Sequence, residues 1–114
     1  MNKKLLVDCG IAYDEGVEKF LDEKELYESL LVNFLTDNTF DEAKNCVEAA
    51  DYDGVMKAVH AMKSVTGTLC MNGLLRKCCE VMDSIRDKDY KTMEKTFGEA
   101  YNMYLEISNA IKNA

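Results

Sequence analysis

The chain has 114 residues, of which 14 are basic and 21 acidic, giving a formal net charge of −7. This length predicts a single domain, residues 1–114, that can bury its own core, and the acidic balance argues against nucleic acid or an anionic membrane surface as a partner. The absence of proline, with only six glycines, favours an all-helical protein.

The first ten residues show little periodicity, and we expect a loose lead-in there. A short helix should follow, with apolar side chains that cover one end of a helical bundle. These side chains are Ile11, Val17, Phe20 and Leu21.

Asp22 and Glu25 are spaced as in a helix-capping box, which predicts a helix from Glu23 to about Leu35. Its apolar face is expected to repeat every four residues, at Leu26, Leu30 and Phe34. After the sequence TDNT, the apolar residues are Phe40, Ala43, Val47 and Ala50. On a continuous helix this second set would lie more than about 100° from the first, so we expect a break near Asn38.

Asp51 is a suitable N-cap for the next helix, which contains the only histidine and should end near Cys70. One arc of this helix is apolar and is predicted to be buried. It contains Val55, Ala58, Val59, Met62, Val65, Thr66 and Leu69. At 100° per residue, His60, Lys63, Ser64 and Gly67 fall away from that arc, so we expect them on the surface.

Two more helices are predicted, with Asn72 and Asp89 as their N-caps. The first should bury Leu74, Cys78, Val81 and Ile85. The second has the most regular pattern, formed by Tyr90, Met93, Phe97, Ala100, Tyr104, Ile107 and Ile111. Short connections between helices of similar length favour an up-down antiparallel four-helix bundle with a short additional N-terminal helix.

The five cysteines are odd in number and contain no CxxC pair, so we expect reduced thiols that pack as small hydrophobic groups. They are Cys9, Cys46, Cys70, Cys78 and Cys79. The apolar run after Lys4 is too short for a signal peptide, and no segment has the roughly 18 apolar residues of a membrane span. We therefore expect a cytosolic (cytoplasmic) protein.

His60, Lys63, Ser64 and Gly67 form the motif H-x-x-K-S-x-x-G on the exposed side of the histidine helix. Imidazole is partly neutral and nucleophilic near neutral pH, and it can accept a phosphoryl group and release it again. Lys63, one turn away, could stabilise the charge on phosphoryl oxygens. Gly67 would leave the surface open to a partner, and Met56 would add an apolar contact one turn before His60.

The chain resembles the histidine-containing phosphotransfer (HPt) domains of two-component phosphorelays. The resemblance runs over most of the chain, from FLDEKELYESLLVNFLTD through the Asp51 and Tyr52 pair and VHAMKSVTGTL to Leu74 and Cys78. It implies a helical bundle that carries a phosphoryl group on His60 to or from the aspartate of a response-regulator receiver domain. A hybrid sensor histidine kinase is a further expected partner, and the carrier is expected to be a monomer.

The chain departs from the family pattern at Ser64 and Cys70, where glycine is usual. Met82 falls where members often carry a polar residue that orients the imidazole, and Arg86, one turn further on, is a candidate second phosphoryl contact. The receiver would supply the metal and the acidic pocket, so we expect no metal site and no cofactor in this chain. Without a nucleotide-binding loop, it should not phosphorylate itself from ATP.

Two alternatives remain at this stage. The first is a degenerate HPt-like bundle that binds a receiver or kinase domain without accepting phosphate, as Ser64, Cys70 and Met82 would suggest. The second is a metal or redox site formed by His60 and the cysteines. The second is disfavoured because Cys70 would lie roughly 15 Å along the helix from His60.

Overall fold

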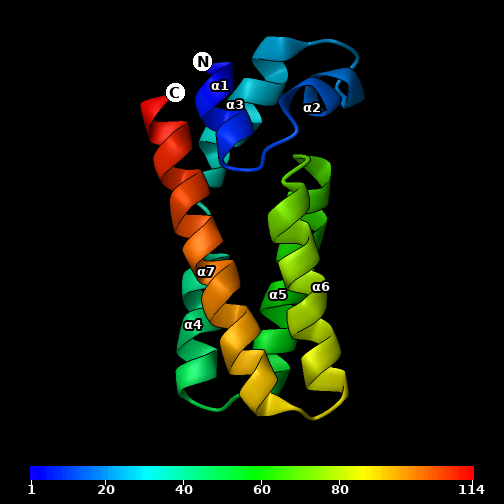
Figure 1. Ribbon diagram of the computed structural model, residues 1–114, viewed down its shortest axis with the longest axis vertical. Helices are drawn as coiled ribbons and strands as arrows, with labels where there is room; N and C mark the ends of the chain where they lie inside the picture. Colours follow the sequence, from blue (N-terminus) through cyan, green and yellow to red (C-terminus); the bar gives the residue numbers. More distant parts are fainter.

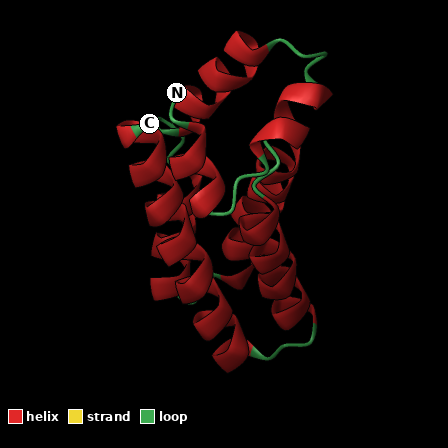
Figure 2. Cartoon of the chain, turned by 45° about the horizontal axis from the view of Figure 1, so that its top comes forward, coloured by secondary structure: helices red, strands yellow, loops and turns green.

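The computed structural model describes residues 1–114 and contains helices without any strand. The molecule is elongated, with extents of 41 × 23 × 20 Å (Figure 1). Seven helices follow one another: α1 (Lys3–Asp8), α2 (Tyr13–Lys19), α3 (Lys24–Phe34), α4 (Thr39–Glu48), α5 (Tyr52–Thr68), α6 (Asn72–Arg86) and α7 (Tyr90–Asn113). Only short loops join them, as the colouring of Figure 2 makes clear.

The last four helices of the structure, α4 to α7, lie alongside one another (Figure 1). Each packs against its neighbour in sequence, and α7 also packs against α4. The three connections use the same turn, in which one residue has a left-handed backbone with φ of 53–57°: Ala50, Cys70 and Lys88. In each turn the following amide donates 2.9 Å to a carbonyl five residues earlier, as in Asp51 to Cys46. This arrangement satisfies carbonyls left free at a helix C-terminus.

The core runs along the inside of these helices and continues beneath the N-terminal segment. In α5, Val55, Val59, Met62 and Thr66 are buried, and Leu69 follows in the connection. The predicted buried arc of the histidine helix is therefore confirmed, with Ala58 and Val65 half-buried at its edges. The predicted pattern of α7 is also confirmed from Met93 to Ile111, and Tyr90 is half-buried.

Residues 1–10 are not a loose lead-in, because residues 3–8 form α1. The Asn2 side chain accepts a hydrogen bond from the Leu5 amide, which caps the helix. Leu6 is fully buried, and α1 packs against α7. The prediction failed because this short segment is stabilised by distant packing and has no periodicity of its own.

The predicted cap of α3 was wrong, and its predicted apolar face was right only in part, since Phe34 is buried and Leu30 is half-buried. Asp22 has a left-handed backbone with φ of 62°, and Glu23 occupies the N-cap without a side-chain hydrogen bond. Tyr27, Leu31 and Phe34 are the buried residues, whereas Leu26 is 44% exposed. Tyr27 points inward because its hydroxyl donates a 2.6 Å hydrogen bond to the Leu69 carbonyl.

Other local predictions had mixed outcomes. The break near Asn38 is confirmed, since α3 ends at Phe34 and α4 begins at Thr39. Asp51 and Asp89 cap α5 and α7 through their carboxylates, as predicted. Asn72 does not cap α6: Met71 occupies the N-cap position, and Asn72 is the first helical residue.

Two further apolar residues do not cover the core as expected. Leu21 is 85% exposed, and Ala50 is exposed in the turn before α5. Both have left-handed backbones, so each belongs to a chain reversal. Their side chains therefore do not lie on the apolar face that they would have joined if the helix had continued.

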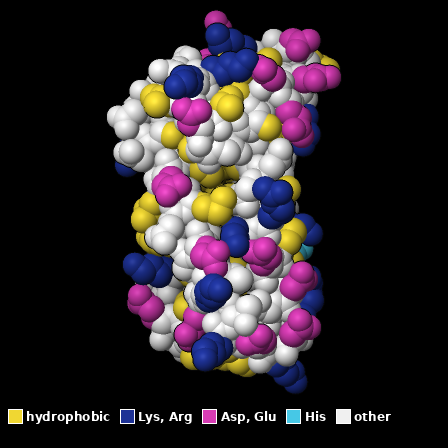
Figure 3. All heavy atoms as spheres, viewed as in Figure 1, with side chains coloured by type: hydrophobic (Ala, Val, Ile, Leu, Met, Phe, Trp, Pro, Cys, Tyr) yellow, Lys and Arg dark blue, Asp and Glu magenta, His cyan; other side chains and the backbone are white.

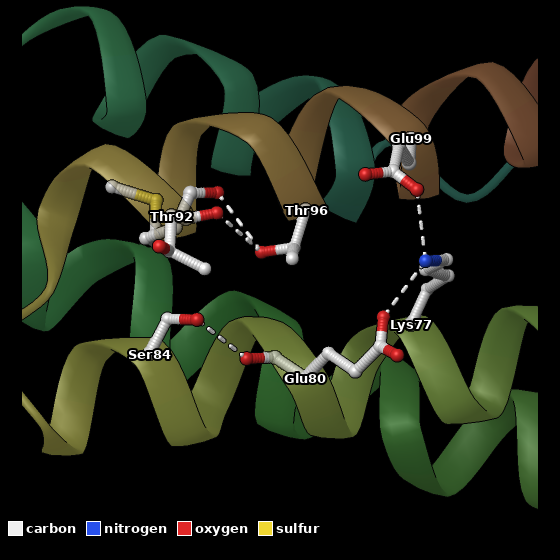
Figure 4. Close-up of polar contacts among 7 residues, drawn as sticks. Lys77, Glu80, Ser84, Thr92, Thr96 and Glu99 are labelled. Atoms are coloured by element: carbon white, nitrogen blue, oxygen red, sulfur yellow. Dashed lines mark hydrogen bonds and ion pairs between the residues drawn. The ribbon is translucent and has the colours of Figure 1, made fainter.

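A polar groove separates part of α6 from α7 (Figure 4). Lys77 Nζ lies 2.9 Å from carboxylate oxygens of both Glu80 and Glu99, which joins the two helices. The Ser84 and Thr96 hydroxyls donate to carbonyls of their own helices, at 2.9 and 3.0 Å. These buried hydroxyls are thus satisfied locally, and they leave a hydrophilic seam beside the core.

The outer surface mixes acidic and basic side chains on the face shown in Figure 3. No helix is both long enough and apolar enough to span a lipid bilayer.

Candidate functional site

The outward side of α5 carries the predicted functional stripe. His60, Lys63 and Ser64 are exposed and Gly67 is half-buried. The buried face of the same helix anchors them, because Val59, Met62 and Thr66 alternate with them along the chain. The predicted exposure of His60 is confirmed, and a packed helix holds it in place.

A shallow depression of about 650 Å³ surrounds this stripe. Residues from α2, from α5 and from the start of α6 line it, and they include four of the predicted site residues. The lining consists of Glu15, Lys19, His60, Lys63, Ser64, Gly67, Thr68, Asn72 and Leu75. The structure therefore adds α2 and α6 to a site that the sequence placed on α5 alone.

Lys19 is the most important addition. Its Nζ donates a 3.1 Å hydrogen bond to the carbonyl oxygen of Gly67, although 48 residues separate the two. That carbonyl lies in the last turn of α5, where it also accepts a 3.3 Å hydrogen bond from the Cys70 amide and where the helix dipole favours a cation. No local pattern could have identified Lys19, because only the fold places the end of α2 near the last turn of α5.

The electrostatic character of the stripe is positive despite the acidic chain. Between Gly54 and Leu69 the histidine helix carries Lys57 and Lys63 and no carboxylate. Neither Lys63 nor His60 takes part in any of the six ion pairs of the chain. Glu15 is the one acidic group in the lining, and its Oε2 accepts a 3.4 Å hydrogen bond from the Asn72 amide.

Space above Gly67 is open. A methyl group added there would meet only Leu75 Cδ2, at 4.0 Å, which is ordinary contact. Packing within the chain therefore does not require glycine at this position. This agrees with the prediction that Gly67 keeps the surface near His60 accessible.

No side chain of this protein orients the His60 ring by a hydrogen bond; the hydrogen bonds within the lining of the depression join Lys19 to the Gly67 carbonyl, Thr68 to the Ser64 carbonyl and Asn72 to Glu15. Met82, at the position where the HPt pattern often has a polar residue, is 2% exposed and belongs to the core. It can neither donate to nor accept strongly from an imidazole.

Arg86 and Met56 lie outside the depression. Arg86 is the last residue of α6, at the end of that helix away from the 69–71 connection, and its Nη1 pairs with Asp83 Oδ1 at 3.2 Å. Met56 is half-buried and packs partly against the core. The structure thus brings Arg86 to a surface ion pair and gives Met56 a structural role as well.

An apolar groove of about 340 Å³ adjoins the depression on the α3 side of α5. Ser64 and Thr68 line both hollows, and Leu30, Phe34, Val65 and Leu69 supply the apolar wall. A partner that covers His60 would therefore meet polar groups on one side of α5 and apolar groups on the other.

Cys70, in the connection after α5, is fully buried. Burial raises the pKa of its thiol, with a smaller lowering by Lys19 and a smaller raising by Glu15. All five cysteines are free thiols. No three histidine, cysteine, aspartate or glutamate side chains lie close enough together to hold a metal ion.

Comparison of the chain with family models, with curated proteins and with solved structures gives no match.

Proposed function

We propose that this protein is a histidine phosphotransfer protein of a two-component phosphorelay. It carries a phosphoryl group on His60 to or from the aspartate of a response-regulator receiver domain. The observation that carries the proposal is the exposed, unpaired imidazole in an open depression, with the unpaired ammonium of Lys63 one helical turn away. A receiver needs such access, because its own active site must close over the histidine.

The reaction needs little from the carrier. A ring nitrogen of His60 attacks the phosphorus of an aspartyl phosphate, the new P–N bond forms, and the P–O bond to the aspartate breaks. The aspartate leaves as a carboxylate, and the metal in the receiver stabilises the transferring group. Lys63 adds positive charge close to the phosphoryl oxygens, and α5 holds both groups on a rigid surface.

The finer architecture belongs to the same proposal. We assign α4 to α7 to the up-down antiparallel four-helix bundle of HPt domains. Their sequential packing and the short connections 49–51, 69–71 and 87–89 support this, because such turns reverse the chain between adjacent helices. The helices α1 to α3 would then be additions at one end of the bundle.

The wider setting follows from the same assignment. A receiver domain and a hybrid sensor histidine kinase are the proposed partners, and the carrier acts as a monomer in the cytosol without its own ATP chemistry. Five unpaired thiols suit a reducing compartment.

Incubation with a phosphorylated receiver domain tests the proposal. The wild type should gain acid-labile phosphate, and His60→Gln should gain none. The exposed position of His60 makes it expected that the variant melts like the wild type, which a thermal scan checks. Retained labelling in His60→Gln would refute the assignment.

The second candidate is a degenerate bundle that binds a receiver or kinase domain without accepting phosphate. The burial of Met82, which leaves His60 without a polar orienting group, favours it. Phosphoramidate, a small phosphodonor, separates the two candidates because it needs no docking. A chain that binds a receiver but is labelled by neither donor would be the degenerate form.

A further inference from the structure

We propose that Lys19 is a specificity-determining residue that docks the receiver domain by contacting an acidic group at the rim of the receiver's active site. The inference rests on the proposed phosphotransfer function and assigns a role to a residue outside the helix that carries His60.

The position of Lys19 fits docking better than chemistry. Its Nζ is held at the Gly67 carbonyl, seven residues beyond His60 on α5. At the rise of an α-helix this separates the ammonium from the imidazole by about 10 Å along the axis. A phosphoryl group on His60 would be out of its reach, so Lys63 alone can serve the transferring group.

The same separation is small on the scale of a protein interface. A typical interface buries about 800 Å² on each partner, which covers a patch much wider than 10 Å. A receiver domain seated on His60 must therefore also cover the α2 end of the depression. Figure 1 shows α2 beside the end of α5, where the chain turns into α6.

The positive charge at the α2 end of the depression also favours an acidic partner. Lys19 is exposed and, like Lys63, forms no ion pair within the chain, so both ammonium groups are available. Glu15 is drawn towards Asn72 by its hydrogen bond. The receiver of a phosphorelay carries an acidic pocket around its aspartate, which matches the two cations Lys63 and Lys19, set about 6 Å apart along the axis of α5. Such complementarity mainly raises the association rate and selects partners.

The hydrogen bond to Gly67 strengthens the argument. A free lysine side chain loses considerable rotamer entropy when it is fixed in an interface. Here the carbonyl at the end of α5 already restrains the ammonium on the docking face. Lys19 would therefore contribute to docking at a lower entropic cost than an unrestrained surface lysine.

The experiment compares Lys19→Glu with Lys24→Glu, which makes the same charge change at an exposed site outside the depression. The rate of phosphoryl transfer from a phosphorylated receiver is measured against receiver concentration, at low and high salt. We expect Lys19→Glu to lower kcat/KM by about tenfold at low salt and much less at high salt, with kcat unchanged. Lys24→Glu should stay within about twofold of the wild type at both salt concentrations.

Lys19→Gln and Lys19→Arg are controls for a purely structural effect, since Lys19 also donates a hydrogen bond to the end of α5. The arginine variant keeps the charge and should retain kcat/KM, whereas the glutamine variant should lose part of it even if its melting temperature is unchanged. Equal kcat/KM for Lys19→Glu and the wild type at low salt would overturn the inference. So would a loss that is the same at all salt concentrations.

Labelling by phosphoramidate distinguishes a failure of the docking role of Lys19 from a failure of the proposed phosphotransfer function. Lys19→Glu should be labelled on His60 at the wild-type rate, because the small donor makes no docking contact. A wild type that is labelled by neither donor would overturn both the function and the role of Lys19. A labelled wild type with an unaffected Lys19→Glu overturns the docking role alone.

Discussion

The ring of Tyr27 lies directly against the backbone of Gly16, so that a methyl group added at Gly16 would overlap the ring. The same tyrosine donates its hydroxyl to the Leu69 carbonyl at the end of α5. This contact joins α2, α3 and the end of the histidine helix. It also positions Lys19, three residues after Gly16, at the depression.

Gly16→Ala should therefore destabilise the protein. The ring cannot move without losing its buried hydrogen bond, so we expect a loss of about 1–3 kcal/mol, the usual cost of overpacking a core. Urea unfolding measures it. Gly98→Ala is the matched control: nothing lies within 4 Å of its added methyl group. The free energy of unfolding of Gly98→Ala should be about 0.5–1 kcal/mol higher than that of the wild type, because alanine has the higher helix propensity. An equal gain at Gly16 would contradict the packing shown here.

Gly67→Ala should separate the effect of Gly67 on the access of a receiver to His60 from its effect on the stability of the fold. The new methyl group meets only Leu75, so unfolding in urea should show no loss of stability and a gain of up to about 1 kcal/mol. Transfer from a phosphorylated receiver should nevertheless slow several-fold, because the methyl group protrudes into the depression. A stable variant that transfers at the full rate would show that Gly67 has no part in access.

Met56→Glu tests the apolar contact before His60. From the sequence alone we expect weaker receiver binding with nearly unchanged thermal stability. Since the side chain is half-buried against the core, we now expect both weaker binding and a loss of about 1 kcal/mol. Met56→Leu should preserve both. Thermal scans and receiver titrations measure the two effects, and unaltered binding by Met56→Glu would remove this residue from the proposed interface.

The cysteines should differ in reactivity and in their effect at high pH. Burial raises the pKa of Cys78 to about 12, so at pH 8 its thiol stays protonated and inert. Iodoacetamide followed by mass spectrometry should show Cys46 and Cys79, which are half-exposed, modified before Cys70 and Cys78. All five should react equally in denaturant. Early modification of Cys78 in the native protein would contradict its burial.

The same burial has a consequence for stability. An unfolded thiol ionises near pH 8.5, whereas Cys78 in the folded protein resists ionisation until about pH 12. Its contribution to stability is therefore complete below about pH 8.5 and declines as the pH rises towards 12. Urea unfolding at pH 7 and at pH 10 should show lower stability at the higher pH.

The sequence predicted the elements whose stability comes from a long apolar face. The periodicity of α5 and α7 located their buried residues, and Asp51 and Asp89 marked their first turns. The outward orientation of His60 followed from the same periodicity of 100° per residue. Strong amphipathic periodicity is sufficient in these helices because the core covers one whole side of each.

The failures lie in the N-terminal segment, where distant contacts decide the structure. In α3, the sets beginning at Leu26 and at Tyr27 were both consistent with a helical face, and the hydrogen bond to Leu69 decided between them. The Asn2 side chain that caps α1 was a usable local signal, as Asn is a favoured N-cap. Lys19 had no such signal, so the second cation of the candidate site could not be predicted.

The order in which helices pack has a consequence for synthesis on the ribosome. The contacts of α4 with α5, α5 with α6 and α6 with α7 are between successive elements, which favours rapid closure as the chain emerges. In contrast, α1 packs against α7 and buries Leu6 there. Helix α1 therefore cannot pack until α7 has been synthesised, and until then its apolar side remains uncovered.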